Sequence, residues 1–403
     1  MRAFAVVAVL TYLLLGSADT VLSLQILSGT FTNITSTAEG MISLRQQEHL
    51  QVTADGIRHL LVNTGSDCAP ESLVLMSAPR EATQWRVSFS LRDTDQASSG
   101  DILLENNRLH IVYRDLYGAI IYAETTYDNQ AGTWAPVQTR VVTGGGERAR
   151  APTLAVDSNG RVYVAYTVVD FVVTIHMAYS DDPLDVWYDS GFSWGSENSL
   201  GAKSARMIVS GEKIGLIYTD VRFWLGRLQN MMKWSLLEGN DPATGSWSDT
   251  IISFGTTDDH DPFGSHFSAV TNGSGNVYLV WAVDRSIRYF RYNGTTGEWS
   301  SVPIFGNSFR TAYLQISRHV DGRLYTIFNV GSYLVVMESA DDGKSFSFHS
   351  FCWHSIQWWQ DWSNPRMETP SVFFDQLSIL QQVGIQDPAL PEVQVLFQYQ
   401  MVP

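Results

Sequence analysis

Short runs of alternating apolar and polar residues recur along the whole chain. Five of these runs are near copies of one another. Each is rich in β-branched and aromatic residues, and each has an aromatic residue at its sixth position. They are RLHIVYRD (108–115), RVYVAYTV (161–168), KIGLIYTD (213–220), NVYLVWAV (276–283) and RLYTIFNV (323–330). Alternation with a period of two is typical of β-strands, and polar turns such as DSNGR and NGSGN before several runs indicate hairpins. The pattern predicts an all-β protein.

A second pattern follows these runs and ends on tryptophan. DNQAGTW (128–134), DPATGSW (241–247) and NGTTGEW (293–299) share Asp or Asn at the first place and Gly at the fifth, and DDPLDVW (181–187) is a looser copy. Asp and Asn can bond the backbone of a tight turn, and glycine permits positive φ. We therefore expect a turn between the third and fourth strands of a repeated unit. We expect its tryptophan to pack between neighbouring units rather than to bind a sugar.

The repeated unit has a nearly constant length. The aromatic residues that close the turns are separated by 49, 53, 60, 52 and 47 positions. These residues are Trp85, Trp134, Trp187, Trp247, Trp299 and Phe346. Four short strands recurring at such a period are typical of β-propeller blades.

The two ends of the chain decide the number of blades. After Phe346 three more strands follow, in PSVFF, LSILQQV and EVQVLFQYQM, while SLQILSGTFTNITS (23–36) belongs to no other unit. We expect this N-terminal piece to supply the outer strand of the last blade, because closing the ring removes an exposed sheet edge. The sequence thus predicts one β-propeller domain over 19–403 with seven four-stranded blades. Six blades are the alternative, because the first and last units match the repeat least well.

The first eighteen residues predict export. Arg2 precedes an apolar run, and small residues at 16–18 suit cleavage after Ala18. The apolar run is too short to span a bilayer comfortably, and no later stretch could do so. We therefore expect a signal peptide over 1–18 and a secreted, monomeric protein, with an uncleaved anchor as the alternative.

Composition limits the classes of partner that the protein can bind and indicates which covalent modifications it can carry. The net charge of −15 over 403 residues argues against nucleic acid as a partner. Asn-x-Ser/Thr sequons at Asn33, Asn272 and Asn293 would carry glycans in a eukaryotic host. The two cysteines suit an oxidising compartment. We place Cys68 in a loop of the first blade and Cys352 in the connection into the last, and predict a disulfide between them that locks the ring.

The alternation of strand direction sorts the loops onto two faces. We call the face with the a–b and c–d turns the turn face, and the face with the b–c loops and blade-to-blade connections the loop face. Loops on the loop face are longer and more varied, and such loops commonly carry function. Several arginines gather there in an acidic chain with 26 Lys and Arg, and arginine binds carboxylates through a bidentate fork. The alternative is that these arginines pair with loop aspartates. The candidate substrate-binding residues are Arg114, Arg150, Arg222, Arg310, Arg366, Trp358 and Trp359.

One turn carries a family signature. SADDGKSF (339–346) matches the Asp-box pattern through Ser339, Asp341, Gly343 and Phe346. Together with the four-strand period and APTLAVDSNGRVYVAY, this motif resembles the sialidase-like Asp-box (BNR-repeat) propellers. The Arg-Ile-Pro signature of sialidases is absent, and seven blades exceed their six. In size and blade number the chain is more similar to the seven-bladed polysaccharide lyases that cut uronate-containing chains; other relatives are lectins.

The resemblance implies a carbohydrate-active protein and leaves three functions open. A lyase must neutralise a uronate carboxylate and move the adjacent C5 proton. Its candidate catalytic residues are His260, His266, Tyr117 and Tyr313, with Arg150, Arg310 or Arg366 at the carboxylate. A sialidase-like hydrolase needs two carboxylates across the pocket, for which the candidates are Asp115, Asp220, Asp284 and Glu368. A binding-only propeller is the third possibility; lyase action on an acidic oligosaccharide or polysaccharide, carrying uronate or sialate, is slightly favoured.

No motif for a phosphate or a zinc ion is present, and we expect no cofactor. DDHD (258–261) could hold a metal such as calcium, but four polar residues in a loop are more often solvated.

Overall fold

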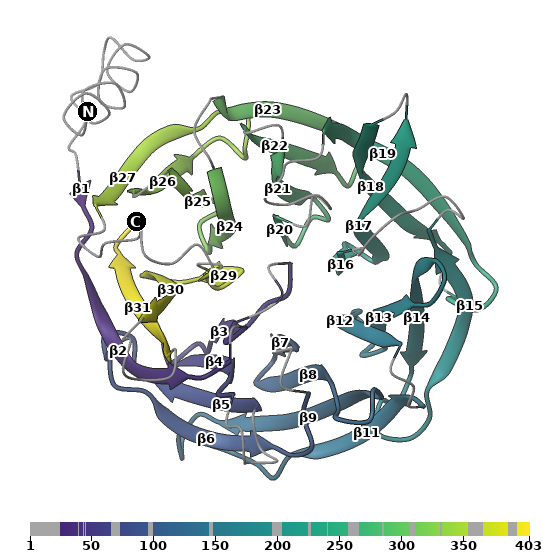
Figure 1. The fold of residues 1–403 in the computed structure, drawn as a ribbon, viewed down its shortest axis with the longest axis horizontal. Coiled ribbons are helices and arrows are strands. Elements are labelled where there is room, and N and C mark those ends of the chain that lie inside the picture. Colours follow the sequence, from purple (N-terminus) through teal and green to yellow (C-terminus); the bar gives the residue numbers. More distant parts are fainter. Residues whose placement is uncertain are drawn as a thin grey trace.

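A computed structural model gives the fold of this chain. It describes residues 25–38, 40–42, 44, 46–65, 73–95, 100–144, 148–195, 204–224, 227–239, 241–256, 266–283, 286–306, 311–330, 333–353, 366–385 and 393–403. Within these ranges every regular element is a β-strand. Seven sheets stand around a central axis, so the prediction of a seven-bladed propeller is confirmed (Figure 1). No helix in the described ranges is long and apolar enough to cross a membrane.

Each blade runs from an inner strand near the axis to an outer strand at the rim. The first three blades are β3 (Leu50–Val52), β4 (Arg58–Asn63), β5 (Leu73–Ala78) and β6 (Arg86–Leu91); β7 (Asp101–Glu105), β8 (Arg108–Arg114), β9 (Ile120–Asp128), β10 (Thr133–Trp134) and β11 (Gln138–Thr143); and β12 (Ala149–Val156), β13 (Val162–Val169), β14 (Val173–Ser180) and β15 (Tyr188–Trp194). Blades 4 to 6 are β16 (Ala205–Ser210), β17 (Lys213–Trp224), β18 (Arg227–Glu238) and β19 (Ser246–Thr256); β20 (Phe267–Thr271), β21 (Val277–Val283), β22 (Ser286–Asn293) and β23 (Glu298–Gly306); and β24 (Thr311–His319), β25 (Leu324–Val330), β26 (Tyr333–Ser339) and β27 (Ser347–Trp353).

The seventh blade joins the two ends of the chain. Its inner three strands are β28 (Met367–Glu368), β30 (Leu377–Ile385) and β31 (Val393–Met401), and its outer strand is β2 (Gly29–Ser36). β2 runs antiparallel to β31, with Gly29 opposite Tyr399. The prediction that the N-terminal piece closes the ring is therefore confirmed. Two short strands predicted for blade 7 lie instead at the edges of blade 6: β1 (Gln25–Ile26), at the start of the N-terminal piece, pairs parallel with β27, and β29 (Val372–Phe373), within PSVFF, pairs parallel with β24. PSVFF is therefore not the inner strand of blade 7, because β28 pairs with β30 in that place.

Apolar packing between blades holds the ring together. The buried apolar residues form seven clusters, and each cluster takes its members from two neighbouring blades. The seam between blades 7 and 1 is as apolar as the others, with Ile34, Leu380 and Leu396 packed against Leu60 and Val62. Burial of apolar surface is the main driving force for folding, so the closed ring is stabilised at seven equivalent interfaces.

The aromatic residues that close the c–d turns lie between blades, as predicted. Trp134 of blade 2 packs edge-on against His59 of blade 1, with ring centroids 4.9 Å apart. Trp247 contacts Trp194 of the preceding blade at 4.8 Å, and Phe346 contacts Tyr289 at 4.8 Å. These contacts account for the repetition of the turn, because the ring that closes a c–d turn packs against the preceding blade. Blade 7 has no c–d turn, since its outer strand β2 comes from the other end of the chain.

The polar residues of the turns bond the backbone. Asn293 Oδ1 accepts hydrogen bonds from the backbone N–H groups of Thr295 and Thr296, and Gly297 has a φ of 75°. In SADDGKSF the Ser339 hydroxyl donates to Asp341 Oδ1, and Gly343 N donates to Ser339 Oγ. The side chains of the turn residues are thus used to fix the loop. The same holds for two sequons, because Asn293 and Asn272, whose Nδ2 donates to the Tyr278 hydroxyl, both belong to such turns.

The seam carries an additional polar contact. Asn33 Nδ2 donates to the carbonyl oxygen of Trp85 at 2.9 Å, and Asn33 Oδ1 accepts from the Trp85 N–H at 2.7 Å. The third sequon asparagine thereby ties the outer strand of blade 7 to the turn of blade 1.

Cys352 differs from its predicted place. It lies within β27, the outer strand of blade 6, and packs in the cluster between blades 6 and 7 rather than in the connection into blade 7. Cys68 lies outside the described residues, so the disulfide stays a prediction.

Candidate functional site

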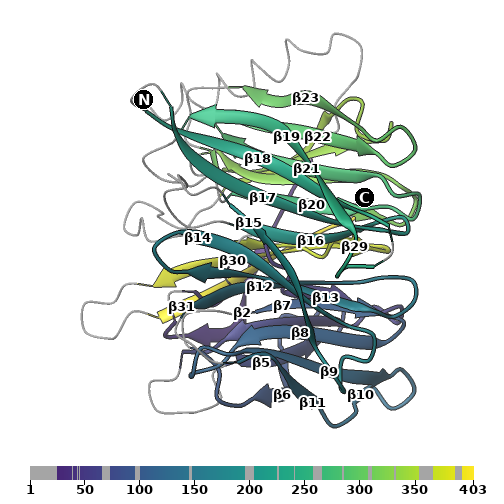
Figure 2. The ribbon, with the colours of Figure 1, turned by 90° about the vertical axis from the view of Figure 1, so that its right-hand side faces the viewer.

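The seven innermost strands bring distant residues to one end of the central channel. They are β3, β7, β12, β16, β20, β24 and β28, and all of them start on the loop face and run toward the turn face (Figures 1 and 2). The first residues of these strands, and those just before them, therefore meet around the axis. They include Glu48, Asp101, Arg150, Arg206, His266, Tyr313 and Glu368.

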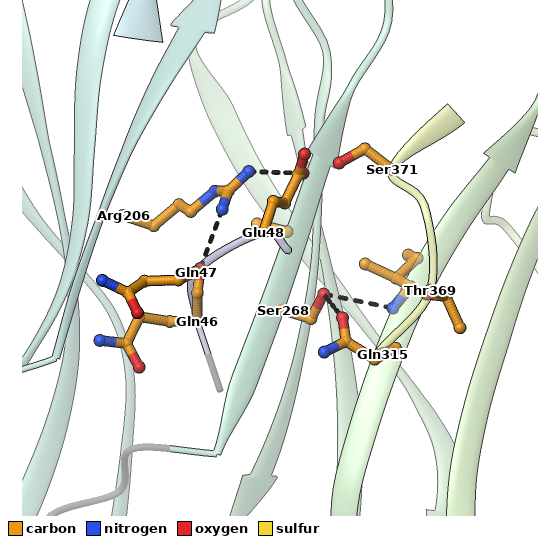
Figure 3. A pocket seen from close by; sticks show the side chains of 10 residues that line it. Gln46, Gln47, Glu48, Arg206, Ser268, Gln315, Thr369 and Ser371 are labelled. Carbon is orange, nitrogen blue, oxygen red and sulfur yellow. Dashed lines mark hydrogen bonds and ion pairs between the residues drawn. The ribbon is translucent and has the colours of Figure 1, made fainter. Parts of the chain in front are cut away.

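A buried charge network lies on the axis. Arg206 of blade 4 reaches across to Glu48 of blade 1, with Nη2 and Oε1 2.5 Å apart, and its Nη1 lies 3.3 Å from Oδ1 of Asp101 in blade 2. Arg206 Nη1 also donates to the Gln46 carbonyl oxygen at 3.0 Å (Figure 3). Burial raises the pKa of Glu48 to about 7, although the Arg206 guanidinium opposes the shift. One arginine thus joins three blades.

The inner strands bond one another through side chains. Asp101 Oδ2 accepts from the Thr153 hydroxyl and the Leu154 N–H of the next blade. On the opposite side of the ring, the Ser268 hydroxyl donates to Gln315 Oε1 at 2.8 Å (Figure 3). Ser268, Gln315 and Arg206 help to line a polar cavity with an empty volume of about 210 Å³, part of which is open to solvent.

The connection from blade 7 to blade 1 closes the channel. After β2 the chain returns to the axis, and Gln47 Nε2 donates to the Pro152 carbonyl oxygen of blade 3 at 2.6 Å. His49 Nδ1 lies 2.7 Å from Glu368 Oε2 of blade 7, and both side chains are buried. Residues 46–49 are therefore bonded to the inner strands of blades 3 and 7, and Gln46, Gln47 and Glu48 line the cavity.

The network predicts a stability that falls as pH rises. Because Glu48 in the folded protein binds its proton up to about pH 7, whereas an ordinary glutamate releases it near 4.5, the folded state holds the extra proton between these values. The free energy of unfolding should fall across this window, by at most about 1.4 kcal/mol per pH unit for one group. Glu48→Gln should flatten the slope in urea unfolding measured at several pH values. A variant with the slope of the parent protein would contradict the assignment.

Two predicted site residues lie at irregularities of inner strands. Register shifts occur between Arg150 and Thr153 in β12 and between Ala312 and Leu314 in β24. Ala151 and Tyr313 adopt left-handed φ values of 50° and 61°, which non-glycine residues rarely do. Bulges and left-handed residues are frequent next to functional sites, where they re-aim side chains.

His266 and Tyr313 come together at the mouth. His266 immediately precedes β20 of blade 5, and its ring centroid lies 5.3 Å from that of Tyr313 in blade 6. The imidazole is buried and the phenol is half-buried. Sequence reasoning named both residues, and the structure places them as a pair.

The candidate arginines of the loop face fall into two groups: those whose guanidinium bonds another residue, and one whose guanidinium is exposed to solvent. Arg114 forms an ion pair with Asp95, Arg222 Nε donates to Gln229 Oε1 at 2.9 Å, and Arg366 Nη1 lies 3.5 Å from the Ile42 carbonyl oxygen. Arg150 is exposed, and its side chain forms no ion pair or hydrogen bond with any part of the chain that the structure describes, although its backbone pairs with Thr167 in the sheet. Arg150 therefore has the guanidinium best suited to meet an anion from solution.

The candidate carboxylates are held by the fold. Asp115 Oδ1 accepts from the backbone N–H groups of Tyr117 and Ala119. Asp220 is fully buried, with Oδ2 2.9 Å from Lys233 Nζ. Glu368 is buried against His49, as noted above. The remaining candidates His260, Asp284, Arg310, Trp358 and Trp359 lie outside the described residues.

The described part of the chain gathers no three His, Cys, Asp or Glu side chains in an arrangement for a metal ion. The DDHD residues (258–261) lie outside the described ranges, so a metal ion there remains an expectation from the sequence.

Comparison with known proteins adds to this geometry. No protein-family model matches the chain, and no curated protein matches it. Its structure is similar to that of a polysaccharide lyase, an ulvan lyase bound to -[GlcA(1-4)Rha3S]-, with a TM-score of 0.57, 12% identity, and coverage of 91% of this chain and 95% of the other. The likeness is one of fold. Weaker similarities include a Trypanosoma rangeli sialidase (TM-score 0.45, 11% identity, 80% and 58% covered) and a lectin from Aleuria aurantia (0.46, 13%, 78% and 98%).

Sequence reasoning missed the buried charge network. Glu48, Asp101 and Arg206 stand at or close to the first residue of an inner strand, whereas the candidates from the sequence came from loops. A usable signal was present, since a charged residue recurs within two places of the first residue of an inner strand in blades 1, 2, 4 and 7, as Glu48, Asp101, Arg206 and Glu368.

Proposed function

We propose that the protein cleaves an acidic polysaccharide by β-elimination at the loop-face mouth of its channel. The observation that carries the proposal is the contact between His266 and Tyr313, with Tyr313 on a bulge in a left-handed conformation. One of the two groups would take the C5 proton of a uronate, and the electron pair would form the C4–C5 double bond. The C4–O bond would break, and the other group would protonate the departing oxygen.

Arg150 would bind the uronate carboxylate. A guanidinium next to that carboxylate favours the negative charge that develops as the C5 proton leaves. Hydrolysis is less well supported, because three of its four candidate carboxylates are committed to turns or ion pairs. Similarity over 91% of the chain to a polysaccharide lyase bound to -[GlcA(1-4)Rha3S]- is consistent with the proposal at the level of fold.

The test is incubation of the purified protein with uronate-containing polysaccharides. An ultraviolet-absorbing unsaturated uronate at the new chain end would support elimination. New reducing ends without that absorbance would indicate hydrolysis, and binding without cleavage would indicate a lectin; either result would overturn the proposal.

Tyr313→Phe should lower kcat by about 10²–10⁴, because the variant keeps the ring but loses the hydroxyl that transfers the proton. The KM should change little. Tyr188→Phe, on the exposed outer strand of blade 3, is the matched control and should leave kcat unchanged. Equal activity of the two variants would remove Tyr313 from the reaction.

Arg150→Ala should lower kcat/KM by about a hundredfold or more on uronate polymers, because the carboxylate loses its counter-charge. Arg140→Ala is the control, since Arg140 is exposed at the rim and bonds the Leu184 carbonyl oxygen. A loss that is the same for both variants would show a general effect of surface charge instead.

A further inference from the structure

Two tight turns on the loop face each present an uncovered aromatic ring. Tyr117, a catalytic candidate from the sequence, stands in the b–c turn of blade 2 and not with the His266–Tyr313 pair of blades 5 and 6, and it is 74% exposed. Phe171, in the b–c turn of blade 3, is 102% exposed. Neither ring contributes to the core, and exposing a large apolar side chain has no benefit for folding. Blades 2 and 3 are neighbours and share one apolar interface.

The turn below Tyr117 is firmly held. Asp115 Oδ1 accepts from the N–H groups of Tyr117 and Ala119, at 2.9 and 2.7 Å. The Leu116 N–H donates to the Asp93 carbonyl oxygen at 2.8 Å. The ring is therefore presented from a fixed backbone, which reduces the entropy lost when a ligand binds.

The turn below Phe171 is tied to the strand that carries Arg150. Val169 pairs with Val173, which leaves a three-residue loop with Phe171 at its tip. The Val169 N–H donates to the Arg148 carbonyl oxygen at 2.9 Å, and Arg148 Nη1 lies 2.7 Å from Asp170 Oδ2. Arg148 is two residues before Arg150, so Phe171 and the available guanidinium belong to one local unit.

From this arrangement we propose that Tyr117 and Phe171 form a second carbohydrate subsite. Here it is called the blade 2–3 platform, and it receives pyranose rings of the same acidic chain whose uronate is bound by Arg150. The inference rests on the proposed function and extends it from the reacting residue to the sugars beside it.

The chemistry of the platform fits such an occupant. Aromatic rings present flat apolar surfaces that match the C–H faces of sugars, and a tyrosine adds a hydrogen-bonding hydroxyl. The protein has a net charge of −15, which would repel an anionic chain elsewhere. An exposed arginine on the strand that is bonded to the Phe171 turn attracts the charge of such a chain, while the two aromatic rings offer apolar faces to its sugars.

The test compares Tyr117→Ala, Phe171→Ala and the double variant with the parent protein. Long uronate polysaccharide and a short oligosaccharide of the same repeat are the probes, with affinity measured by calorimetry. Each single change should weaken polymer binding by about five- to tenfold, and the double change by roughly the product. Binding of the short oligosaccharide, and turnover of it, should stay unchanged. Tyr188→Ala, an aromatic residue that is 49% exposed on β15, is the control.

The outcomes separate the platform from the proposed function. If the parent protein cleaves uronate chains and the double variant binds polymer equally well, the platform is wrong and the function stands. If the parent protein binds neither the long uronate polysaccharide nor the short oligosaccharide, the proposed function itself fails. If the double variant instead changes the sedimentation coefficient of the protein, the two rings form a contact between copies of the chain, and the platform is again refuted.

Discussion

Replacing Arg206 with alanine is expected to lower the free energy of unfolding by about 3–5 kcal/mol at pH 8, because removing one partner leaves buried charges uncompensated. Glu48 and Asp101 would both lose the guanidinium that now lies 2.5 and 3.3 Å away. The loss should be smaller at pH 5, where Glu48 can take up a proton. Urea unfolding followed by tryptophan fluorescence at both pH values measures the effect.

Two comparisons make this result specific. Arg148→Ala removes an exposed ion pair with Asp170 and should cost less than about 1 kcal/mol. Adding Glu48→Gln to Arg206→Ala should recover part of the loss, because it removes one of the stranded charges. An Arg206 variant as stable as the Arg148 variant, or equally unstable at pH 5 and pH 8, would contradict the role assigned to the network.

Deleting residues 25–36 is expected to abolish cooperative folding. The deletion removes β1 and β2, exposes the edge of β31, and takes Ile34 from the core between blades 7 and 1. An open propeller with an unpaired apolar edge should aggregate or be cleaved rapidly by proteases. A synthetic peptide of residues 25–36 should restore protection by adding a strand to the open edge.

A point substitution tests the same seam more gently. A Cβ on Gly29 would lie 2.1 Å from Phe397 Cε1 and 2.7 Å from Tyr399 Cδ1. Gly29→Val should therefore lower the free energy of unfolding by about 1–3 kcal/mol through overpacking. Gly144→Ala is the control, because nothing lies within 4 Å of a Cβ there. If the chain that lacks residues 25–36 unfolds at the same urea midpoint as the parent protein, the ring does not depend on β2.

The sequence predicted the repeat because the aromatic residue that closes a c–d turn packs against the preceding blade. That requirement repeats Trp134, Trp247 and Phe346 at regular intervals, and regular intervals are visible without a structure. Alternation also indicated a strand in PSVFF, but it did not show that β29 joins blade 6 while the two-residue β28 forms the inner strand of blade 7. Parallel pairing of such short pieces depends on where the neighbouring blades lie.

The candidate site was predicted less completely, for a related reason. Arg150, His266 and Tyr313 stand in or beside loops, where polar residues attract notice. Arg206 stands inside the strand ARMIVS, where a polar residue at an alternate position is the normal pattern of a half-exposed strand. Its meeting with Glu48, from the other side of the ring, follows from the closure of seven blades and not from any local pattern.

The seam joins residues 370 positions apart, since Gly29 pairs with Tyr399. Synthesis proceeds from the N-terminus, so β2 is made long before β31. Until β31 exists, β2 has no sheet to join, and blades 1 and 6 lack the neighbour that blade 7 provides. Such distant pairing makes folding slow. Closure of the ring therefore waits for the synthesis of β31, and β2 requires protection from other partners until then.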